Sequence, residues 1–206
     1  MRKKQYTFYF DSSKCSGCKT CQVACKDKNN LESGVLWRRV YEVGSGGWTK
    51  RDGAWIHDVK AYNMSIACNH CEKPICVDVC PTKAMNKNNE GIVQVDEKKC
   101  IGCKYCQWAC PYGAPQYDAI KGIMGKCDFC FDYIEEGRRP SCVDSCPMRA
   151  LDFGEDSVMR KKYGDGNEYF PLPKSRYTKP ALIVKPHTDA SAADDSSAEI
   201  QNEEEV

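Results

Sequence analysis

The alternation of apolar and polar residues divides the chain into short strands and loops. Residues 6–11 are aromatic and β-branched, which predicts a strand, and residues 91–96 alternate like a second strand. Residues 36–43 also favour a strand, the glycine-rich residues 44–47 predict a turn, and residues 54–66 return to an extended pattern. We therefore expect a β-hairpin between the first strand and the second.

Helical patterns are short. Residues 21–29 and 143–150 are expected to form helices, and residues 150–154 a closing strand. Residues 156–163 predict a brief charged helix that ends at Gly164, because glycine is common directly after a helix. The elements are therefore small, and loops between them must carry much of the chain.

The C-terminal part of the chain changes character twice. Residues 170–186 contain four prolines, so they cannot form a regular helix and should be extended. After Lys185 there is no lysine or arginine, and residues 187–206 are rich in Ser, Ala, Asp and Glu. This composition predicts disorder for the last segment.

Cysteine is the residue that changes this picture most. Residues 100–111 read C-I-G-C-K-Y-C-Q-W-A-C-P, the spacing of bacterial iron–sulfur proteins in which the fourth cysteine binds a neighbouring cluster. Cys106 and Cys110 are one helical turn apart, so Cys110 can point past its own cluster. The 16 cysteines form four such groups, which predict four [4Fe–4S] clusters. The groups are Cys15, Cys18, Cys21 and Cys25; Cys68, Cys71, Cys76 and Cys80; Cys100, Cys103, Cys106 and Cys110; and Cys127, Cys130, Cys142 and Cys146.

Two other uses of cysteine fit the sequence less well. A disulfide framework is typical of short secreted chains, whereas this chain has 206 residues and three of its groups end in Cys-Pro. Zinc sites use two Cys-x2-Cys pairs rather than runs of three with a trailing Cys-x3-Cys-Pro. Iron–sulfur clusters are therefore the favoured interpretation.

Length and composition allow one or two domains with a thin ordinary core. The hydrophobic fraction of 41% includes the 16 cysteines, so the clusters are expected to supply much of the folding energy. Residues 6–10 are too short for the apolar part of a signal peptide, and no stretch approaches the roughly 20 apolar residues of a membrane span. We expect a soluble chain, made in the cytoplasm, that is peripheral to the membrane and reaches it only through partners.

Several residues near the cysteines have two interpretations. Basic side chains could offset the charge of the clusters or simply be solvated, and both alternatives stay open; they are Lys19, Lys26, Lys104, Lys126 and Arg149. His70 lies between two cysteines and is expected to donate or accept a hydrogen bond rather than bind metal. No side chains suggest a catalytic site, and the tryptophans are expected to be packing residues; they are Trp37, Trp48, Trp55 and Trp108.

The form of the groups indicates how they pair. The first and third are compact, the second and fourth have a longer third step, and residues 82–99 join the second and third through the strand expected at 91–96. The linker between the third and fourth groups has no strand pattern. The second group should therefore pair with the third, and the first with the fourth. The predicted fold class is α+β, with two nested bacterial-ferredoxin-like modules, an inserted β-hairpin and an extended C-terminal segment.

Five motifs give the sequence a resemblance to a known family. Over about residues 5–186 it resembles the four-cluster iron–sulfur electron-transfer (B) subunit of dimethyl sulfoxide reductase-type molybdoenzyme complexes. These motifs also fit related polysulfide, tetrathionate and formate enzymes, and a free-standing polyferredoxin is the other alternative. Residues 31–67 and 151–186 hold no ligands and favour a subunit with partner-binding surface. The motifs are residues 10–27, 68–76, 100–117, 125–130 and 146–154.

The resemblance implies a ligand set for each cluster. Cys103 stands where related nitrate reductase subunits have another residue and a three-iron cluster, so four irons are expected there. The first group has Lys26 in place of the trailing proline, so its helix could continue. The implied sets are Cys15, Cys18, Cys21 and Cys146 for cluster 1; Cys25, Cys127, Cys130 and Cys142 for cluster 2; Cys68, Cys71, Cys76 and Cys110 for cluster 3; and Cys80, Cys100, Cys103 and Cys106 for cluster 4.

The resemblance also implies partners and a domain organisation. The protein would carry single electrons between a molybdopterin guanine dinucleotide catalytic subunit and an integral membrane anchor that oxidises quinol. It would itself be a non-catalytic subunit of an oxidoreductase. The expected divisions are module one (1–30 and 120–155, clusters 1 and 2), the hairpin (31–66), module two (67–119, clusters 3 and 4), an extended partner-binding segment (156–186) and a disordered acidic tail (187–206).

Overall fold

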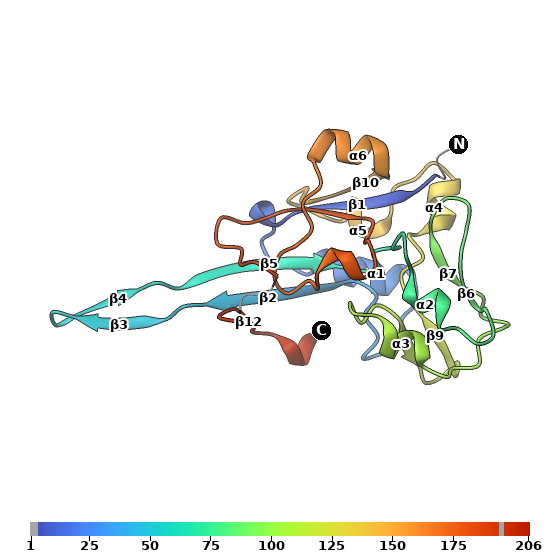
Figure 1. Ribbon diagram of the computed structural model, residues 1–206, viewed down its shortest axis with the longest axis horizontal. Helices are drawn as coiled ribbons and strands as arrows, with labels where there is room; N and C mark the ends of the chain where they lie inside the picture. Colours follow the sequence, from blue (N-terminus) through green and yellow to red (C-terminus); the bar gives the residue numbers. More distant parts are fainter. Residues whose placement is uncertain (1–3, 194–195) are drawn as a thin grey trace.

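The computed structural model describes residues 4–193 and 196–206, and it combines small β-sheets with short helices. Helices and loops gather at one end of the molecule, and a long hairpin extends from them (Figure 1). The strands are β1 (Tyr6–Asp11), β2 (Arg39–Ser45), β3 (Trp48–Arg51), β4 (Ala54–His57), β5 (Lys60–Ile66), β6 (Met85–Lys87), β7 (Val93–Val95), β8 (Gln116–Asp118), β9 (Ile123–Gly125), β10 (Leu151–Glu155), β11 (Leu182–Lys185) and β12 (Glu199–Ile200). The helices are α1 (Thr20–Lys28), α2 (Ile75–Asp78), α3 (Tyr105–Ala109), α4 (Phe131–Glu135), α5 (Ser141–Asp144) and α6 (Asp156–Tyr163), with 3-10 turns at Ser12–Lys14, Ser175–Tyr177 and Glu203–Glu205.

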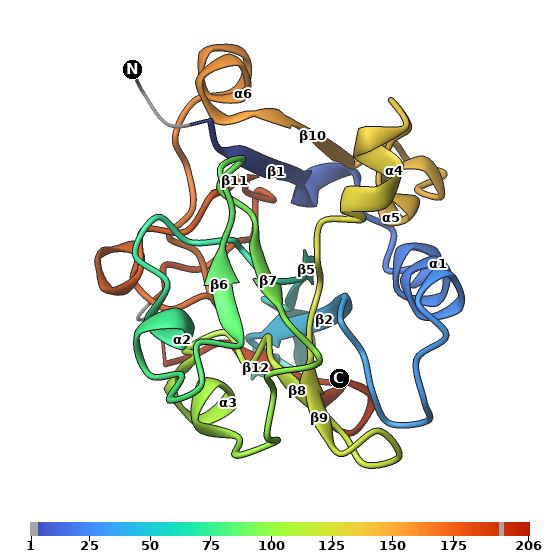
Figure 2. The ribbon, with the colours of Figure 1, turned by 90° about the vertical axis from the view of Figure 1, so that its right-hand side faces the viewer.

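The central sheet places β1 between two strands from late in the sequence. β1 pairs antiparallel with β10 and parallel with β11. Because side chains alternate along a strand, Phe8 and Phe10 face the main core, while Tyr9 packs with Ile183 and Met159 on the opposite face. α6 covers that second face (Figure 2). The cysteine-bearing loops are therefore left to the face of Phe8 and Phe10.

An aromatic cluster lies on the core face of this sheet. Phe129 is fully buried, and its ring stacks on Phe8 with the ring centroids 4.0 Å apart. The rings of Tyr6, His70 and Phe153 also contact Phe129, with centroid distances of 5.8, 5.1 and 6.2 Å. The cluster joins the central sheet to the loop that carries Cys127 and Cys130.

The long hairpin is built from two pairs of strands in succession. β2 pairs with β5 next to the body, and β3 pairs with β4 farther out, where every residue of both strands is exposed. The turn expected at residues 44–47 is wrong, because Gly44 lies within β2 and the backbone reverses direction at Asp52 and Gly53. Both of these residues have positive φ, at 50° and 84°, as a two-residue hairpin turn requires.

The helices pack in two pairs that join distant cysteine groups. α1 packs on α5, and α2 packs on α3. The helix expected over residues 143–150 is shorter and earlier, because α5 ends at Asp144 and Pro147 cannot continue it. None of the described helices has the length and apolar character needed to cross a bilayer.

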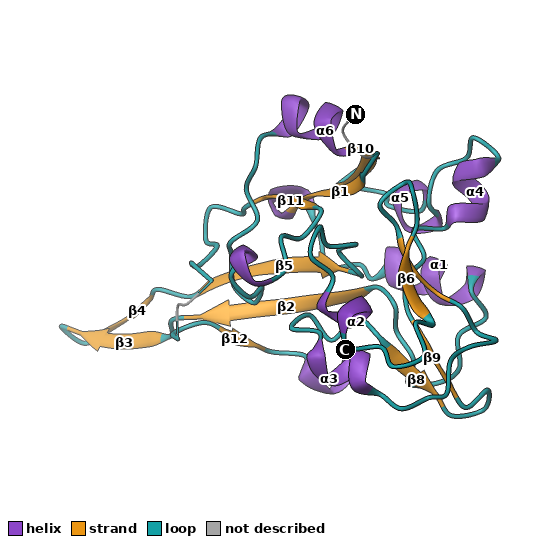
Figure 3. Cartoon of the chain, turned by 45° about the vertical axis from the view of Figure 1, so that its right-hand side comes forward, coloured by secondary structure: helices purple, strands orange, loops and turns teal. Residues whose placement is uncertain are grey.

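Two small hairpins flank the second pair of helices, and the sequence indicated only one of them. β6 pairs with β7, in agreement with the strand expected at residues 91–96. β8 also pairs with β9, so the linker between the third and fourth cysteine groups does contain strands (Figure 3). Each of these strands has three residues, which is too short for an alternating pattern to be recognised in the sequence.

Residues 156–186 end within the core of the protein itself. The helix expected over residues 156–163 is confirmed as α6, and Gly164 follows it with a φ of 84°. The extended segment then provides β11, in which Leu182, Ile183 and Val184 are buried. The hydrogen-bonding edge of β1 satisfies its backbone, so at least this part is a structural strand rather than free partner-binding surface.

The end of the chain is ordered against the hairpin, which differs from the disorder expected for residues 187–206. β12 pairs with β2, and Ala198 is buried. The side chain of Asn202 accepts a hydrogen bond from the Glu42 backbone N–H at 2.9 Å and donates one to the Val40 carbonyl at 3.0 Å. The composition did not indicate this, because the pairing uses the free edge of a distant strand.

We expect Asn202→Ala to release the end of the chain from β2. The substitution removes both side-chain hydrogen bonds from a buried position and leaves the Val40 and Glu42 backbone groups unpaired, which costs about 1–3 kcal/mol for each buried group. Limited proteolysis should then remove the tail faster than in the unaltered protein. Glu203→Ala, at an exposed position of the same segment, is the control and should be cleaved at the original rate. Equal cleavage rates in the two variants would contradict the role of Asn202.

Candidate iron–sulfur sites

The first and third cysteine groups use the same backbone design. In each, the glycine before the second cysteine (Gly17, Gly102) and the lysine after it (Lys19, Lys104) have positive φ, between 57° and 69°. A Cβ on Gly102 would also overlap a neighbouring carbonyl oxygen, so only glycine fits there. α1 and α3 begin directly after the lysines, and the third cysteine lies in the first turn of each helix.

Four cysteines from the two ends of the sequence surround one small cavity. Three come from the loop before α1 and its first turn, and the fourth follows α5. The backbone N–H of Ala150 donates to the Sγ of the fourth at 3.3 Å, and the Ser65 hydroxyl lies 3.4 Å from the Sγ of Cys21. We call these residues set one: Cys15, Cys18, Cys21 and Cys146.

A second cavity has the same construction in the other half of the protein. It lies between α3 and the two small hairpins, with Met85, Val95 and Met124 in its lining. The backbone N–H of Met85 donates to the Sγ of Cys80 at 3.4 Å, and that of Met124 donates to the Sγ of Cys100 at 3.3 Å. We call its cysteines set four: Cys80, Cys100, Cys103 and Cys106.

The remaining eight cysteines gather between these two cavities. In one group the thiol of Cys25 interacts electrostatically with Cys142 and Cys130, and the thiol of Cys127 with Cys25 and Cys130. We call this group set two: Cys25, Cys127, Cys130 and Cys142. In the other, the thiol of Cys76 interacts with Cys68, Cys110 and Cys71. We call it set three: Cys68, Cys71, Cys76 and Cys110.

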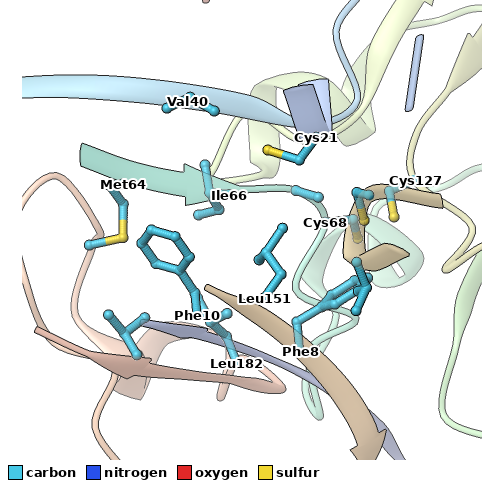
Figure 4. Packing of buried hydrophobic residues seen from close by; sticks show 14 of the residues in the cluster. Phe8, Phe10, Cys21, Val40, Met64, Ile66, Cys68, Cys127, Leu151 and Leu182 are labelled. Carbon is cyan, nitrogen blue, oxygen red and sulfur yellow. The ribbon is translucent and has the colours of Figure 1, made fainter. Parts of the chain in front are cut away.

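Neighbouring sets are also in electrostatic contact with one another. Cys21 of set one interacts with Cys142 of set two, and Cys127 of set two interacts with Cys68 of set three. Figure 4 shows Cys68 and Cys127 next to each other beneath the aromatic rings of the core. Sets three and four are joined through α3, whose start carries Cys106 and whose end is followed by Cys110. The four sets therefore follow one another in the order one, two, three, four.

Burial determines the protonation of most of these thiols. It raises the pKa of Cys25 and Cys71 to about 12 and that of Cys15, Cys106 and Cys130 to about 11. These groups would stay protonated in the metal-free protein at neutral pH, whereas a coordinating thiol is deprotonated outright. Burial also opposes ionisation of Cys80, but backbone N–H groups led by that of Met85 outweigh it and lower its pKa.

A buried positive charge fits the presence of anionic groups at sets one and two. Arg38 is only 2% exposed, and within the described part of the chain its Nε and Nη2 atoms have no hydrogen-bond partner. Burial would lower its pKa, but the thiol groups of Cys142 and Cys21 raise it further than burial lowers it. An anionic cluster with thiolate ligands would supply the missing acceptors and the missing negative charge.

The spacing of the sets suits a cluster rather than one ion. Among the described residues, no three Cys, His, Asp or Glu side chains are arranged to hold a single metal ion. Sets one and four instead enclose cavities, as ligands around a cubane of four irons would. A wider groove between β2, β5 and residues 197–201 contains none of the cysteines.

Comparisons with known proteins agree with this arrangement. The 4Fe-4S dicluster domain model matches residues 59–156. The sequence is 51% identical to the B subunit of anaerobic dimethyl sulfoxide reductase from Escherichia coli (strain K12) over 202 residues, which are 98% of each protein. This protein belongs to the B-subunit family of dimethyl sulfoxide reductases. It is 52% identical to the corresponding B subunit of Haemophilus influenzae (98% of this protein, 100% of the relative) and 38% identical to the thiosulfate reductase electron transfer subunit PhsB of Salmonella typhi (80% and 84%).

Membership of the B-subunit family confirms the resemblance identified from the motifs. It also confirms that [4Fe–4S] clusters are the cofactors, since the matching domain model is a 4Fe-4S domain. The relatives are subunits of reductases by name, so the B-subunit family consists of components of larger complexes.

Two expectations about other polar residues can now be compared with the structure of this B-subunit family member. His70 is fully buried, and its Nδ1 accepts a hydrogen bond from the Val93 backbone N–H at 3.0 Å, so Nε2 carries the proton. Lys126 is also buried and donates to the carbonyls of Val93 and Cys127, whereas Arg149 bonds to backbone carbonyls while remaining largely exposed. The basic residues around the cysteines therefore do not share one role.

The expectation that the tryptophans are packing residues is wrong for three of them. Trp48, Trp55 and Trp108 are 61%, 65% and 73% exposed. Trp37 is partly buried, and its ring lies against Gly125. Tryptophans in short strands and helices of this B-subunit family member are therefore available for contacts with other molecules.

Arg38 is the site residue that the sequence analysis missed. Its signal was present, because Arg38 and Arg39 interrupt an apolar stretch that predicts a strand, and no acidic residue stands within two positions of them. Two adjacent arginines at the start of a buried strand need counter-charges from elsewhere in the fold. In this member of the B-subunit family, cysteine side chains lie where those counter-charges are needed.

Proposed function

We propose that the protein relays single electrons through four [4Fe–4S] clusters, one at each of sets one to four. The convergence of all 16 cysteines into four neighbouring sets carries this proposal. Each set offers four thiol ligands, which is the number a [4Fe–4S] cluster needs. Iron–sulfur clusters supply one-electron chemistry, and the residues of this protein hold them, exclude water from them and donate hydrogen bonds to their ligands.

The same grouping supports two nested modules. Sets one and two take their cysteines from residues 1–30 and 120–155, where α1 packs on α5. Sets three and four take theirs from residues 67–119, where α2 packs on α3. Each module exchanges a cysteine between its two sets, as the fourth ligand of a ferredoxin-type pair does. We propose residues 31–66 as an inserted hairpin between them.

Exposed apolar side chains support a partner at the end of set four. Ile101, Tyr105 and Trp108 are 65%, 52% and 73% exposed, and all three lie in or beside the loop that carries Cys103. Ile120, in the neighbouring β8–β9 turn, is 75% exposed. Large exposed apolar patches mark contact surfaces. We propose that this end meets an integral membrane anchor that oxidises quinol, so the protein is peripheral to the membrane through its partner.

The opposite end supports contact with a catalytic partner. Cys18 of set one is exposed, and so is Met148 beside Cys146. A cluster held there could exchange electrons directly with a second protein. We propose that this protein is the molybdopterin guanine dinucleotide subunit of a dimethyl sulfoxide reductase, because the relatives with 51–52% identity carry that name.

The proposal predicts about 16 iron atoms per polypeptide in anaerobically purified protein, since each of four cubanes holds four irons. The protein should be brown, and dithionite should bleach its visible absorbance. Iron, sulfide and zinc analysis on one sample checks the prediction. About eight irons, or zinc in a stoichiometric amount, would contradict four clusters.

A further inference from the structure

Arg38 occupies the space between set one and set two. It precedes β2 directly, and its Nη1 donates a hydrogen bond to the Ser65 hydroxyl at 3.1 Å. The guanidinium carbon lies 4.8 Å from the centre of the Phe8 ring. These contacts fix one edge of the guanidinium group, while Nε and Nη2 remain without a hydrogen-bond partner among the described residues.

The charge of this guanidinium requires an anion close by. Arginine stays protonated in proteins, and an unpaired charge is strongly unfavourable in a buried position. Arg38 interacts most strongly with Cys142, and then with Cys21, Cys127 and Cys25. Three of these four residues belong to set two and one belongs to set one. No carboxylate is among its leading electrostatic partners.

On the basis of the proposed function, we propose that Arg38 is a positioning residue for the electron relay. Its Nε–H and Nη2–H groups donate hydrogen bonds to sulfur atoms of the clusters at sets two and one, and its charge raises their reduction potentials. Reduction adds one negative charge to a cluster, so a fixed positive charge nearby stabilises the reduced form. The effect is larger at set two, which contributes more of the sulfur atoms around the guanidinium.

A purely structural role for Arg38 makes a different prediction. The stacking on Phe8 and the bond to Ser65 could anchor the start of the hairpin to the body, and losing them would affect stability alone. Reduction potentials separate the two roles, because they respond to charge and hydrogen bonds at each cluster. They can be measured cluster by cluster, independently of turnover.

Arg39 is the matched control for this experiment. It is the next residue, and it is also buried, at 8% exposure. Its Nη2 donates to the Tyr112 carbonyl at 2.6 Å, and its charge acts on Cys110 of set three. Removing the charge at Arg39 should therefore affect a different cluster from the one affected by removing the charge at Arg38.

The experiment is a potentiometric titration followed by electron paramagnetic resonance, on the full-length protein in the complex in which it is made. The proteins compared are the unaltered protein, Arg38→Gln, Arg38→Lys and Arg39→Gln. In Arg38→Gln, one cluster should show at least a tenfold shift of its one-electron equilibrium toward the oxidised form, which equals about 59 mV. A second cluster should shift less, and the other two should not move. In Arg39→Gln, a different signal should shift.

The outcomes separate this inference from the proposed function. Failure to find four reducible clusters in the unaltered protein would overturn the proposed function and this inference with it. Four clusters whose potentials do not change in Arg38→Gln, or that all change equally, would overturn the inference alone. If Arg38→Gln does not assemble its clusters, Arg38→Lys decides. Lysine keeps the charge but has no fork of donors, so the set-two potential should still fall, and an unchanged potential would overturn the inference.

Discussion

Replacing Cys103 by serine should reduce quinol-driven turnover of the complex severely while largely sparing turnover driven by a small artificial donor. Serine is a harder and poorer ligand than a thiolate for iron–sulfur clusters, so the cluster at set four should be converted or lost. Electrons from the proposed membrane anchor must cross that cluster. A small donor can deliver electrons nearer to the catalytic subunit. Both activities should be measured on the same membranes, with spectra of the clusters at the other three sets.

A serine substitution outside the cavity serves as the control for Cys103. Lys121 is exposed in the nearby β8–β9 turn, and Lys121→Ser should change neither activity. The expected pattern in Cys103→Ser is a loss that follows the electron source and not the amount of complex. If the set-four cluster is lost and quinol-driven turnover is unchanged, set four does not lie on the path from the membrane.

Phe129→Ala should lower the free energy of unfolding by about 3–5 kcal/mol, the usual cost of removing a fully buried phenylalanine side chain. The ring contacts four others, including the stacked ring of Phe8, and it lies between Cys127 and Cys130 of set two. Natural domains are stable by only about 5–15 kcal/mol, so the loss is a large fraction of the total. Under anaerobic conditions, cluster absorbance should bleach at a lower guanidinium concentration than in the unaltered protein.

Phe153→Ala is the matched comparison for Phe129. Phe153 contacts the same cluster of rings but is only partly buried and lies on β10, away from the cysteine loops. Its removal should cost less and should leave set two intact. Equal sensitivity of the two variants to guanidinium would show that the position of Phe129 between two ligands has no special weight.

Local sequence patterns predicted the elements that local chemistry determines. The aromatic run at β1, the charged helix α6 and its terminal Gly164 all appear where the sequence placed them. The Cys-x2-Cys-x2-Cys runs likewise indicated tight loops, because their glycine and lysine positions need positive φ. These features depend on a few adjacent residues, so one sequence is enough to recognise them.

The features that the sequence did not predict depend on distant partners. Gly44 suggested a turn, but pairing with β5 and β12 holds it in a strand. The acidic end of the chain suggested disorder, but the free edge of β2 and the Asn202 side chain order it. Arg38 is noticed only once the cysteines around it are known. In each case the deciding contact joins residues that are far apart in the sequence.

The position of β1 between β10 and β11 determines the order in which the protein can be built during translation. The first strand made by the ribosome cannot complete its sheet until residues beyond 182 have been synthesised. Sets one and two also wait for Cys142 or Cys146, whereas residues 67–119 contain every cysteine of sets three and four. The second half-module can therefore mature while the first is still incomplete. Insertion of iron and sulfur should proceed from the middle of the sequence outward, and the earliest cysteines to emerge are among the last to be used.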